Sequence, residues 1–344
     1  MSDLSQTCLH LQQGLAENRW TGFSLAAFQR GKHHAIAGGD VPDPSAAVRW
    51  YSAGKPVTAV GVLRLVEKSP ALLDLPMETT FRELLGTYAG GLSLKAILTH
   101  QTGLRFTDTE LWSLSKNQWT CLIEADPSHG QLQPGQAAYD PAGGWWLLGQ
   151  WLQKHSGLPW PDFLHDEVLS PAGSGNMFFA NQQTDGVVPM MGRRAGKWIP
   201  VKPGHGPGSG LCGSATDLAR FYFTLLCAGT HPAMGRCVFT PDSVKNLTYR
   251  WREGKRDATF GHIVDFGLGV IVDSNRYGAT TVPYGFGTAS SELAFGHGGA
   301  RSSIAFADPA TNLAVAVFLN GLVPESEHQP RMRAILDLLR SDLA

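Results

Sequence analysis

A serine hydroxyl and a lysine amine stand three residues apart at Ser52 and Lys55. Residues at positions i and i+3 share one face of a helix, so this amine can reach the hydroxyl within a single turn. A hydroxyl that is activated by a neighbouring amine is a nucleophile suited to acyl transfer. The pair therefore predicts covalent serine chemistry, with Ser52 as the nucleophile and Lys55 as its activator.

A second pair with the same spacing occurs at Ser113 and Lys116, so spacing alone does not identify the nucleophile. Downstream of Ser52, the apolar-rich residues 56–66 predict a buried amphipathic helix with Pro56 in its first turn. Ser52 would then lie at a helix N-terminus, where free N–H groups and the positive dipole end favour an oxyanion. Ser113 lies in a polar stretch without such a helix, and we interpret it as a chance match.

A candidate proton carrier is Tyr139, which lies in a loop directly before a helix that is predicted to begin near Pro141. A phenol held near a lysine amine is biased toward its anion and can relay the serine proton to the leaving group. A tyrosine at such a position is more commonly a core or turn residue. The catalytic interpretation therefore depends on its combination with Ser52 and Lys55.

A glycine-rich segment over residues 295–301 lies between two strand-like runs. The small Gly298 and Gly299 would let a substrate backbone approach closely, and the Ala300 N–H could point at the same oxygen as the Ser52 N–H. Two such backbone donors form an oxyanion hole. We therefore predict that Ser52 and Ala300 supply it.

Four further side chains are candidates for contacting substrate. His297 is expected to line the pocket or to orient its strand, and Arg301 is either an anion contact or an exposed surface arginine. Trp112 and Trp146 belong to a tryptophan-rich stretch that could line an apolar acyl or aryl pocket, with core packing as the alternative. Residues 106–125 are predicted to cap the cleft and to set specificity.

The order of predicted elements indicates an α+β fold. Residues 22–38 predict a strand hairpin, and residues 56–244 are mainly helical with long connections that contain Gly and Pro. Strand-like runs return after residue 256, at residues 266–272, 292–295, 303–307 and 313–319. An amphipathic helix over residues 331–343 closes the chain. We expect an antiparallel sheet flanked by terminal helices, with an inserted mainly helical domain.

The domain boundaries follow from this arrangement. Residues 1–55 and 245–344 would form a discontinuous sheet domain, and residues 56–244 would form the helical insertion. The active site is expected between the two domains. The sequence shows no internal repeat and no low-complexity tract.

Composition narrows the classes of partner. The chain has 344 residues, of which 43% are hydrophobic and 17% charged, so it is long enough to bury a large core. Its net charge of -1 gives no electrostatic reason to bind nucleic acid or an anionic membrane. No apolar run reaches the roughly 18 residues of a membrane span. Five cysteines without a Cys-x-x-Cys pair and an N-terminus without an export signal favour a cytoplasmic location. The twelve histidines show no metal-binding spacing, so neither a metal nor another cofactor is expected.

Four segments together resemble the class C β-lactamase, family VIII carboxylesterase and DD-peptidase-like superfamily of serine hydrolases. Residues 48–59 (VRWYSAGKPVTA) resemble its nucleophile motif, and residues 94–104 (LKAILTHQTGL) resemble its Leu-Leu-Thr-His-x-Ser-Gly-Leu segment. Residues 208–221 (GSGLCGSATDLARF) resemble its later glycine-rich helix start, and residues 295–299 (FGHGG) resemble its His-x-Gly or Lys-Thr-Gly strand. The resemblance extends over nearly the whole chain.

The resemblance implies that Ser52 is acylated, that Lys55 activates it, that Tyr139 is the general base or proton relay, and that no metal is required. Whether Lys55 or Tyr139 takes the first proton stays open. Two departures favour ester or non-lactam amide substrates. Pro141 stands where lactamases of this class carry the Asn of Tyr-x-Asn, and His297 stands where they carry a lysine that attracts the substrate carboxylate.

The leading expectation is a carboxylesterase that acts on a small or medium acyl ester. The alternatives are an acyltransferase or amide hydrolase in a biosynthetic pathway, a β-lactamase or DD-peptidase, and a non-catalytic binding module of the same fold. The partner in the first case is a small acyl substrate. The sequence leaves the oligomeric state undetermined.

Overall fold

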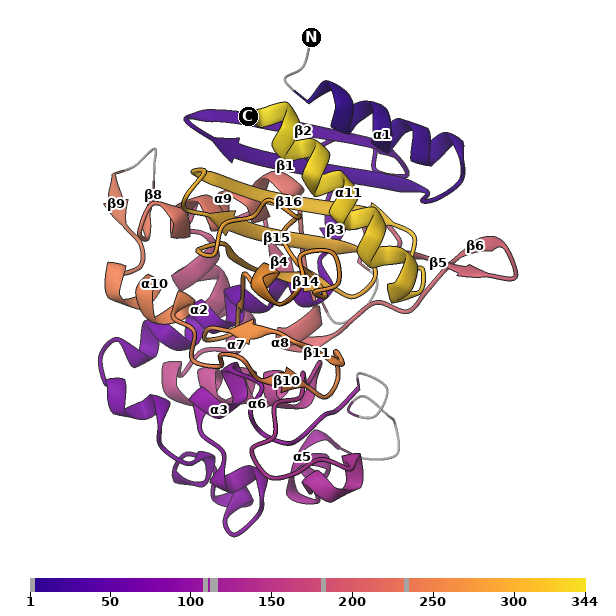
Figure 1. Cartoon of the computed structure of the whole chain (residues 1–344). Helices are drawn as coiled ribbons and strands as arrows, with labels where there is room; N and C mark the ends of the chain where they lie inside the picture. Colours follow the sequence, from indigo (N-terminus) through magenta and orange to yellow (C-terminus); the bar gives the residue numbers. More distant parts are fainter. Residues whose placement is uncertain (1–3, 108–110, 112–116, 181–183, 232–234) are drawn as a thin grey trace.

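Seven strands form one fully antiparallel sheet that joins the two ends of the chain (Figure 1). The computed structural model describes residues 4–107, 111, 117–180, 184–231 and 235–344. The strands of the sheet are, in spatial order, β12 (Asp265–Phe266), β13 (Ile271–Val272), β14 (Phe295–Gly299), β15 (Ser303–Asp308), β16 (Leu313–Asn320), β1 (Gly22–Gln29) and β2 (Lys32–Gly39). The first hairpin pairs with the last strand, from Gly22 opposite Asn320 to Gln29 opposite Leu313.

Helices cover both faces of this sheet. α1 and α11 lie together on one face, at the top of Figure 1, and α9 packs on the other face against β1, β15 and β16. The remaining helices lie mostly below the sheet in that view. The helices are α1 (Ser5–Ala16), α2 (Lys55–Val66), α3 (Leu94–Leu98), α5 (Gln118–Ile123), α6 (Gly143–Ser156), α7 (Trp160–Leu164), α8 (Gly206–Ser209), α9 (Ala215–Leu226), α10 (Pro241–Thr248) and α11 (Glu325–Leu343).

Short strands add four small sheets. β7 (Leu211–Gly213) pairs on its two sides with β3 (Val48–Arg49) and β4 (Phe178–Phe179). The other pairs are β5 (Met191–Arg194) with β6 (Lys197–Pro200), β8 (Thr230–His231) with β9 (Arg236–Cys237), and β10 (Arg256–Asp257) with β11 (His262–Ile263). β3 matters most for function, because it leads directly to the predicted nucleophile.

Alternation along β16 divides the core into two parts. Ala314, Ala316 and Phe318 face the cluster that contains α9 and α2, whereas Val315 and Val317 face the cluster that contains α11. Successive side chains of a strand point to opposite faces, so a continuous apolar run is buried on both sides. This burial explains why the predicted strand pattern lacks polar alternation here.

The predicted α+β class is confirmed, with early and late strands in one antiparallel sheet. One predicted strand, residues 266–272, is wrong in detail, because the structure divides it into β12 and β13. Gly269 has a φ of 79°, and the Gly267 N–H donates to the Val270 carbonyl, so the chain reverses there. β14 begins at Phe295, where the predicted strand 292–295 ends.

The proposed division into residues 1–55 with 245–344 and residues 56–244 stays a prediction. α9 falls within the second range and packs on the sheet that the first range builds. None of the helices among the described residues combines the length and hydrophobicity that crossing a bilayer requires.

Candidate active site

Ser52 lies in a single 3-10 turn, Tyr51–Gly54, that connects β3 to α2. The turn is fixed on its N-terminal side by Trp50, whose indole N–H donates to the Gly213 carbonyl at 3.0 Å and whose own carbonyl accepts from the Ser303 hydroxyl at 3.0 Å. Tyr51 has a φ of 49°, a left-handed conformation that is strained for a residue with a side chain. The nucleophile therefore sits on a backbone that its surroundings hold in place.

Lys55 begins α2 and is fully buried, with Pro56 directly behind it in the first turn. Its Nζ donates to the Pro141 carbonyl at 2.8 Å and to the Gly208 carbonyl at 2.9 Å. A Cβ at position 208 would lie 2.8 Å from Nζ, so a side chain there would displace the amine. Buried cationic groups require such partners because leaving water is costly. The Lys55 amine is consequently fixed beside the nucleophile turn.

Tyr139 meets the nucleophile directly, because its hydroxyl donates to the Ser52 Oγ at 2.8 Å. The Lys55 Nζ lies 5.6 Å from the centre of the Tyr139 ring. Phe260 stacks on the same ring at a centroid distance of 4.8 Å. A proton thus has a hydrogen-bonded path between Ser52 and Tyr139, and the Lys55 amine lies over the face of the same phenol ring.

A buried carboxylate fixes the backbone of Tyr139. The Asp257 Oδ1 accepts from the N–H groups of Tyr139, Thr259 and Phe260 at 3.1, 2.9 and 3.0 Å. Its Oδ2 pairs with the Arg252 guanidinium at 2.9 Å, and both side chains are fully buried. Thr259 adds a hydroxyl bond to the Tyr139 carbonyl at 2.9 Å. Asp257 therefore positions both Tyr139 and the ring that stacks on it.

Asp140 and His100 support the loop from the opposite side. Asp140 accepts N–H bonds from Phe106, Ala142, Gly143 and Gly144, between 2.6 and 3.2 Å, and so caps the start of α6. Burial raises the pKa of this carboxyl, and the four N–H donors oppose that rise. The Asp140 N–H itself donates to the His100 Nδ1 at 3.1 Å. The loop that holds Tyr139 and Pro141 is thereby tied to the segment that follows α3.

His297 is a neutral group in this site. Burial, and then the charge of Lys55, lower the pKa of His297 to about 3. Its Nδ1 contacts the Gly298 carbonyl at 2.7 Å, and because a carbonyl can only accept, Nδ1 carries the proton. Its buried Nε2 is an acceptor without a partner among the described residues. His297 therefore cannot attract a substrate carboxylate by charge.

One cavity of about 350 Å³ brings the predicted chemistry together. Its wall includes Ser52, Tyr139, His297, Gly298 and Ala300, so both predicted oxyanion donors border the same space. The remaining residues of its wall are Pro141, Thr259, Phe260, Pro283, Tyr284, Glu325 and Gln329.

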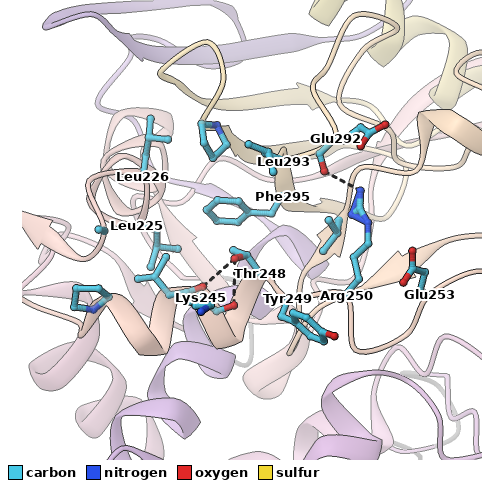
Figure 2. A pocket seen from close by; sticks show the side chains of 15 residues that line it. Leu225, Leu226, Lys245, Thr248, Tyr249, Arg250, Glu253, Glu292, Leu293 and Phe295 are labelled. Carbon is cyan, nitrogen blue, oxygen red and sulfur yellow. Dashed lines mark hydrogen bonds between the residues drawn. The ribbon is translucent and has the colours of Figure 1, made fainter.

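A larger cavity, of about 650 Å³, lies elsewhere, between α10, the end of α9 and β14 (Figure 2). Leu225, Leu293 and Phe295 contribute apolar side chains to its wall, and Lys245 and Arg250 contribute basic ones. None of the predicted site residues lines it. Size alone would therefore have indicated a cavity that contains none of the predicted site residues.

A family model of beta-lactamases matches residues 10–340. The chain belongs to the beta-lactamase family. The esterase EstB of Burkholderia gladioli is 24% identical, across 79% of this chain and 76% of the esterase.

Solved structures agree with the beta-lactamase family at the level of the fold. A penicillin-binding protein homologue from Caulobacter crescentus has a TM-score of 0.79 and 22% identity, and the match covers 99% of this chain and 98% of that one. EstCE1, a hydrolase with promiscuous acyltransferase activity, has a TM-score of 0.78 and 18% identity, covering 97% of this chain and 98% of that one. The predicted superfamily is thus confirmed.

Several predicted contact residues lie outside the Ser52 cavity of this beta-lactamase-family chain. Trp146 is buried and packs edge-on against Trp119 at 5.0 Å, without lining the cavity. Arg301 is exposed, and its backbone carbonyl accepts a hydrogen bond from the Arg331 guanidinium at 2.9 Å. Trp112 lies outside the described residues, as do Ser113 and Lys116. Substrate contact by any of these side chains stays a prediction.

The two glycines have a packing reason that the sequence did not reveal. A Cβ on Gly298 would lie 1.9 Å from the Tyr284 ring, and a Cβ on Gly299 would lie 2.3 Å from the Trp50 carbonyl. Of the two, Gly298 lines the cavity. These contacts with the protein's own atoms require glycine whether or not a substrate backbone approaches.

Sequence reasoning missed Asp257, Gly208 and Glu325. Gly208 stands in a glycine-rich run, which is a usable signal of close backbone approach. Asp257 and Glu325 have no such signal, because the bonds that tie them to the cavity wall, to Tyr139 and Tyr284, join residues that are distant along the chain. Among the described residues, no cluster of three or more His, Cys, Asp or Glu side chains could hold a metal ion.

We predict that Asp257→Asn lowers the free energy of unfolding by about 3 kcal/mol, because it leaves the buried Arg252 charge without its counterion. The kcat for hydrolysis of p-nitrophenyl butyrate should fall more than KM changes, because the neutral amide oxygen accepts the Tyr139 N–H more weakly than the carboxylate does and the new NH2 group faces the Arg252 guanidinium. Urea unfolding and steady-state kinetics measure the two effects. The exposed Asp242→Asn is the matched control, and equal stability of the two variants would refute the positioning role.

We also predict that His297 makes stability depend on pH. Between about pH 3 and 6.5 the unfolded chain binds a proton at this side chain and the folded chain does not, so the free energy of unfolding rises with pH across that window. Relative to His297→Gln, the native protein should lose about 2 kcal/mol more between pH 8 and pH 5. Urea unfolding at both pH values tests this, with the exposed His129→Gln as control.

Proposed function

We propose that this protein is a serine carboxylesterase that works through an acyl-enzyme on Ser52. The observation that carries the proposal is the 2.8 Å hydrogen bond between the Tyr139 hydroxyl and the Ser52 Oγ, at the edge of a cavity that Ala300 also lines. The buried Lys55 amine lies beside this pair. A nucleophile, a proton carrier and two backbone donors are the groups that acyl transfer needs.

Acylation begins when the Ser52 Oγ attacks the carbonyl carbon of the ester, and its proton passes to the pair formed by Tyr139 and Lys55. The pair accepts this proton in the form that lacks one proton, with either a Tyr139 phenolate or a neutral Lys55 amine. The carbonyl oxygen becomes an oxyanion that the N–H groups of Ser52 and Ala300 stabilise. The intermediate collapses with cleavage of the bond to the alcohol oxygen. The alcohol leaves with the proton that Ser52 gave up, and the acyl group stays on Ser52.

Deacylation reverses these roles with water as the nucleophile. Water attacks the acyl carbon while Tyr139 and Lys55 receive its proton, and the same two N–H groups hold the second oxyanion. The bond to Ser52 Oγ breaks, the serine regains a proton, and the carboxylic acid is released. No oxidant, metal or additional reactant enters this sequence.

Two features of the wall favour esters over β-lactams. Pro141 offers no side-chain amide to hold a substrate amide, and its carbonyl is already engaged by Lys55. His297, with a pKa of about 3, supplies no positive charge for a lactam carboxylate. Similarity to an esterase from Burkholderia gladioli supports the same choice. We also propose a cytoplasmic location, which remains a prediction from the sequence.

A second candidate is acyl transfer to an alcohol or amine acceptor. The structural neighbour EstCE1, a hydrolase with promiscuous acyltransferase activity, supports it. Both activities share the acylation step and differ only in the second nucleophile. Product analysis with a primary alcohol present separates them, because a new ester in place of free acid indicates transfer.

We predict that Ser52→Ala abolishes hydrolysis of p-nitrophenyl butyrate, and that Tyr139→Phe lowers kcat by about 10²- to 10⁴-fold, because it keeps the stacked ring and removes the proton carrier. Intact-protein mass after brief treatment with a fluorophosphonate should show one adduct on the native protein and none on Ser52→Ala.

Ser45→Ala, which replaces an exposed serine, serves as the matched control. This variant should react with the fluorophosphonate and hydrolyse p-nitrophenyl butyrate as the native protein does. Unchanged esterase activity in Ser52→Ala would disprove the assignment. Absence of both adduct and turnover in the native protein would instead favour a non-catalytic binding module.

A further inference from the structure

The wall of the Ser52 cavity carries a single formally charged side chain among its described residues, the carboxylate of Glu325. This residue begins α11 and is itself exposed, so it stands where the cavity meets solvent. Phe260, Pro283 and Tyr284 make much of the nearby wall apolar or aromatic. A ligand in this cavity would therefore meet an apolar surface with one negative charge at its mouth.

Hydrogen bonds hold this carboxylate in position. The Tyr284 hydroxyl donates to Glu325 Oε1, and the Gln329 side-chain amide donates to Oε2 at 2.7 Å. The Gln329 Oε1 in turn accepts the Tyr284 backbone N–H at 2.7 Å. Burial, followed by the charge of Glu325, keeps the pKa of Tyr284 well above its ordinary value, so Tyr284 remains the donor. Glu325 is consequently the charged acceptor of a closed network.

Tyr284 links this network to the catalytic strand. Its φ of 54° is a left-handed conformation, which costs free energy and persists only where the surroundings enforce it. Its ring lies so close to Gly298 that no side chain fits at that position, and its centroid lies 5.9 Å from that of Phe260. The strained tyrosine thus joins the Glu325 carboxylate to the wall beside β14.

The lysine and arginine side chains near Glu325 and Ser52 do not line the cavity, and His297, which lines it, is neutral. The Lys55 amine is bonded to two carbonyls. The Arg331 guanidinium interacts with Glu325 through space but donates to the carbonyls of Arg301 and Gly321. Among the described side chains that line the cavity, Glu325 is therefore the one that attracts or repels a substrate charge.

We propose that the Ser52 cavity selects esters that carry an ammonium group beyond the ester carbonyl, with Glu325 as the specificity-determining residue. This inference rests on the proposed esterase function. The ammonium would lie beside the Glu325 carboxylate and the aromatic faces of Phe260 and Tyr284, which attract cations. Esters with a carboxylate in the same place would be disfavoured by like charge.

Three p-nitrophenyl esters of similar shape test the proposal: the 4-(trimethylammonio)butyrate, its uncharged isostere 5,5-dimethylhexanoate, and the anionic hemiglutarate. Spontaneous hydrolysis is subtracted with Ser52→Ala. The native protein should show kcat/KM about three- to tenfold higher for the cationic ester than for the isostere, mainly through KM, because the pair is partly solvated. The anionic ester should fall below the isostere, and added salt should shrink both differences.

Glu325→Gln is the diagnostic variant, since it keeps the size of the side chain and removes the charge. The cation-to-isostere ratio should fall to about one. Glu327→Gln makes the same charge change two residues along α11 at an exposed position outside the cavity wall, and it should keep the ratio. Equal ratios in the native protein and Glu325→Gln, or an equal loss in Glu327→Gln, would overturn the proposal.

The wild-type measurements separate this proposal from the esterase assignment. Hydrolysis of the isostere without any preference for charge would overturn the role of Glu325 and leave the esterase function intact. Failure to hydrolyse any of the three esters, together with no fluorophosphonate adduct on Ser52, would overturn the esterase function itself.

Discussion

The buried Lys55 amine is the constraint on which the site depends. A lysine with no solvent exposure needs partners, and the carbonyls of Pro141 and Gly208 supply them at 2.8 and 2.9 Å. These carbonyls come from separate segments, one before α6 and one in α8. The same two bonds therefore satisfy the amine and draw the Tyr139 loop and the glycine-rich segment against the nucleophile turn. Gly208 is required because any side chain would occupy the space of the amine.

Some of the backbone strain lies around this centre. Of the ten non-glycine residues with a left-handed conformation among the described residues, Tyr51, His100, Tyr284 and Arg301 adjoin Ser52, the Tyr139 loop, the cavity wall and Ala300. Each costs about 1–3 kcal/mol and persists only where packing enforces it. The Arg252 guanidinium and the Asp140 N–H bond to His100, and the indole and carbonyl bonds of Trp50 hold the turn that contains Tyr51. Fixed geometry of this kind lets donors and proton carriers act without reorganising during the reaction.

The electrostatics of the cavity differ from those of a site that binds carboxylates. His297 is neutral because burial and Lys55 oppose its protonation, and Arg301 is exposed outside the cavity wall. The formal charge on the wall is instead the carboxylate of Glu325. A beta-lactamase-family scaffold can therefore keep the Ser52 hydroxyl, the Lys55 amine and the Tyr139 phenol together beside a wall whose formal charge is negative.

The sequence by itself determined the family, the fold class and the order of the elements, and it indicated the candidate catalytic residues. The spacing of Ser52 and Lys55, the helix signalled by Pro56 and the apolar run behind it, and the strand patterns at both ends are local features, and local spacing is enough to predict them. Tertiary structure decided the rest. Tyr139 meets Ser52 across 87 residues, Asp257 reaches Tyr139 across 118, and Tyr284 reaches Glu325 across 41. Trp146 packs in the core, outside the cavity wall, and Gly269 divides a predicted strand. Such contacts depend on how distant segments pack, and no spacing within one segment encodes them.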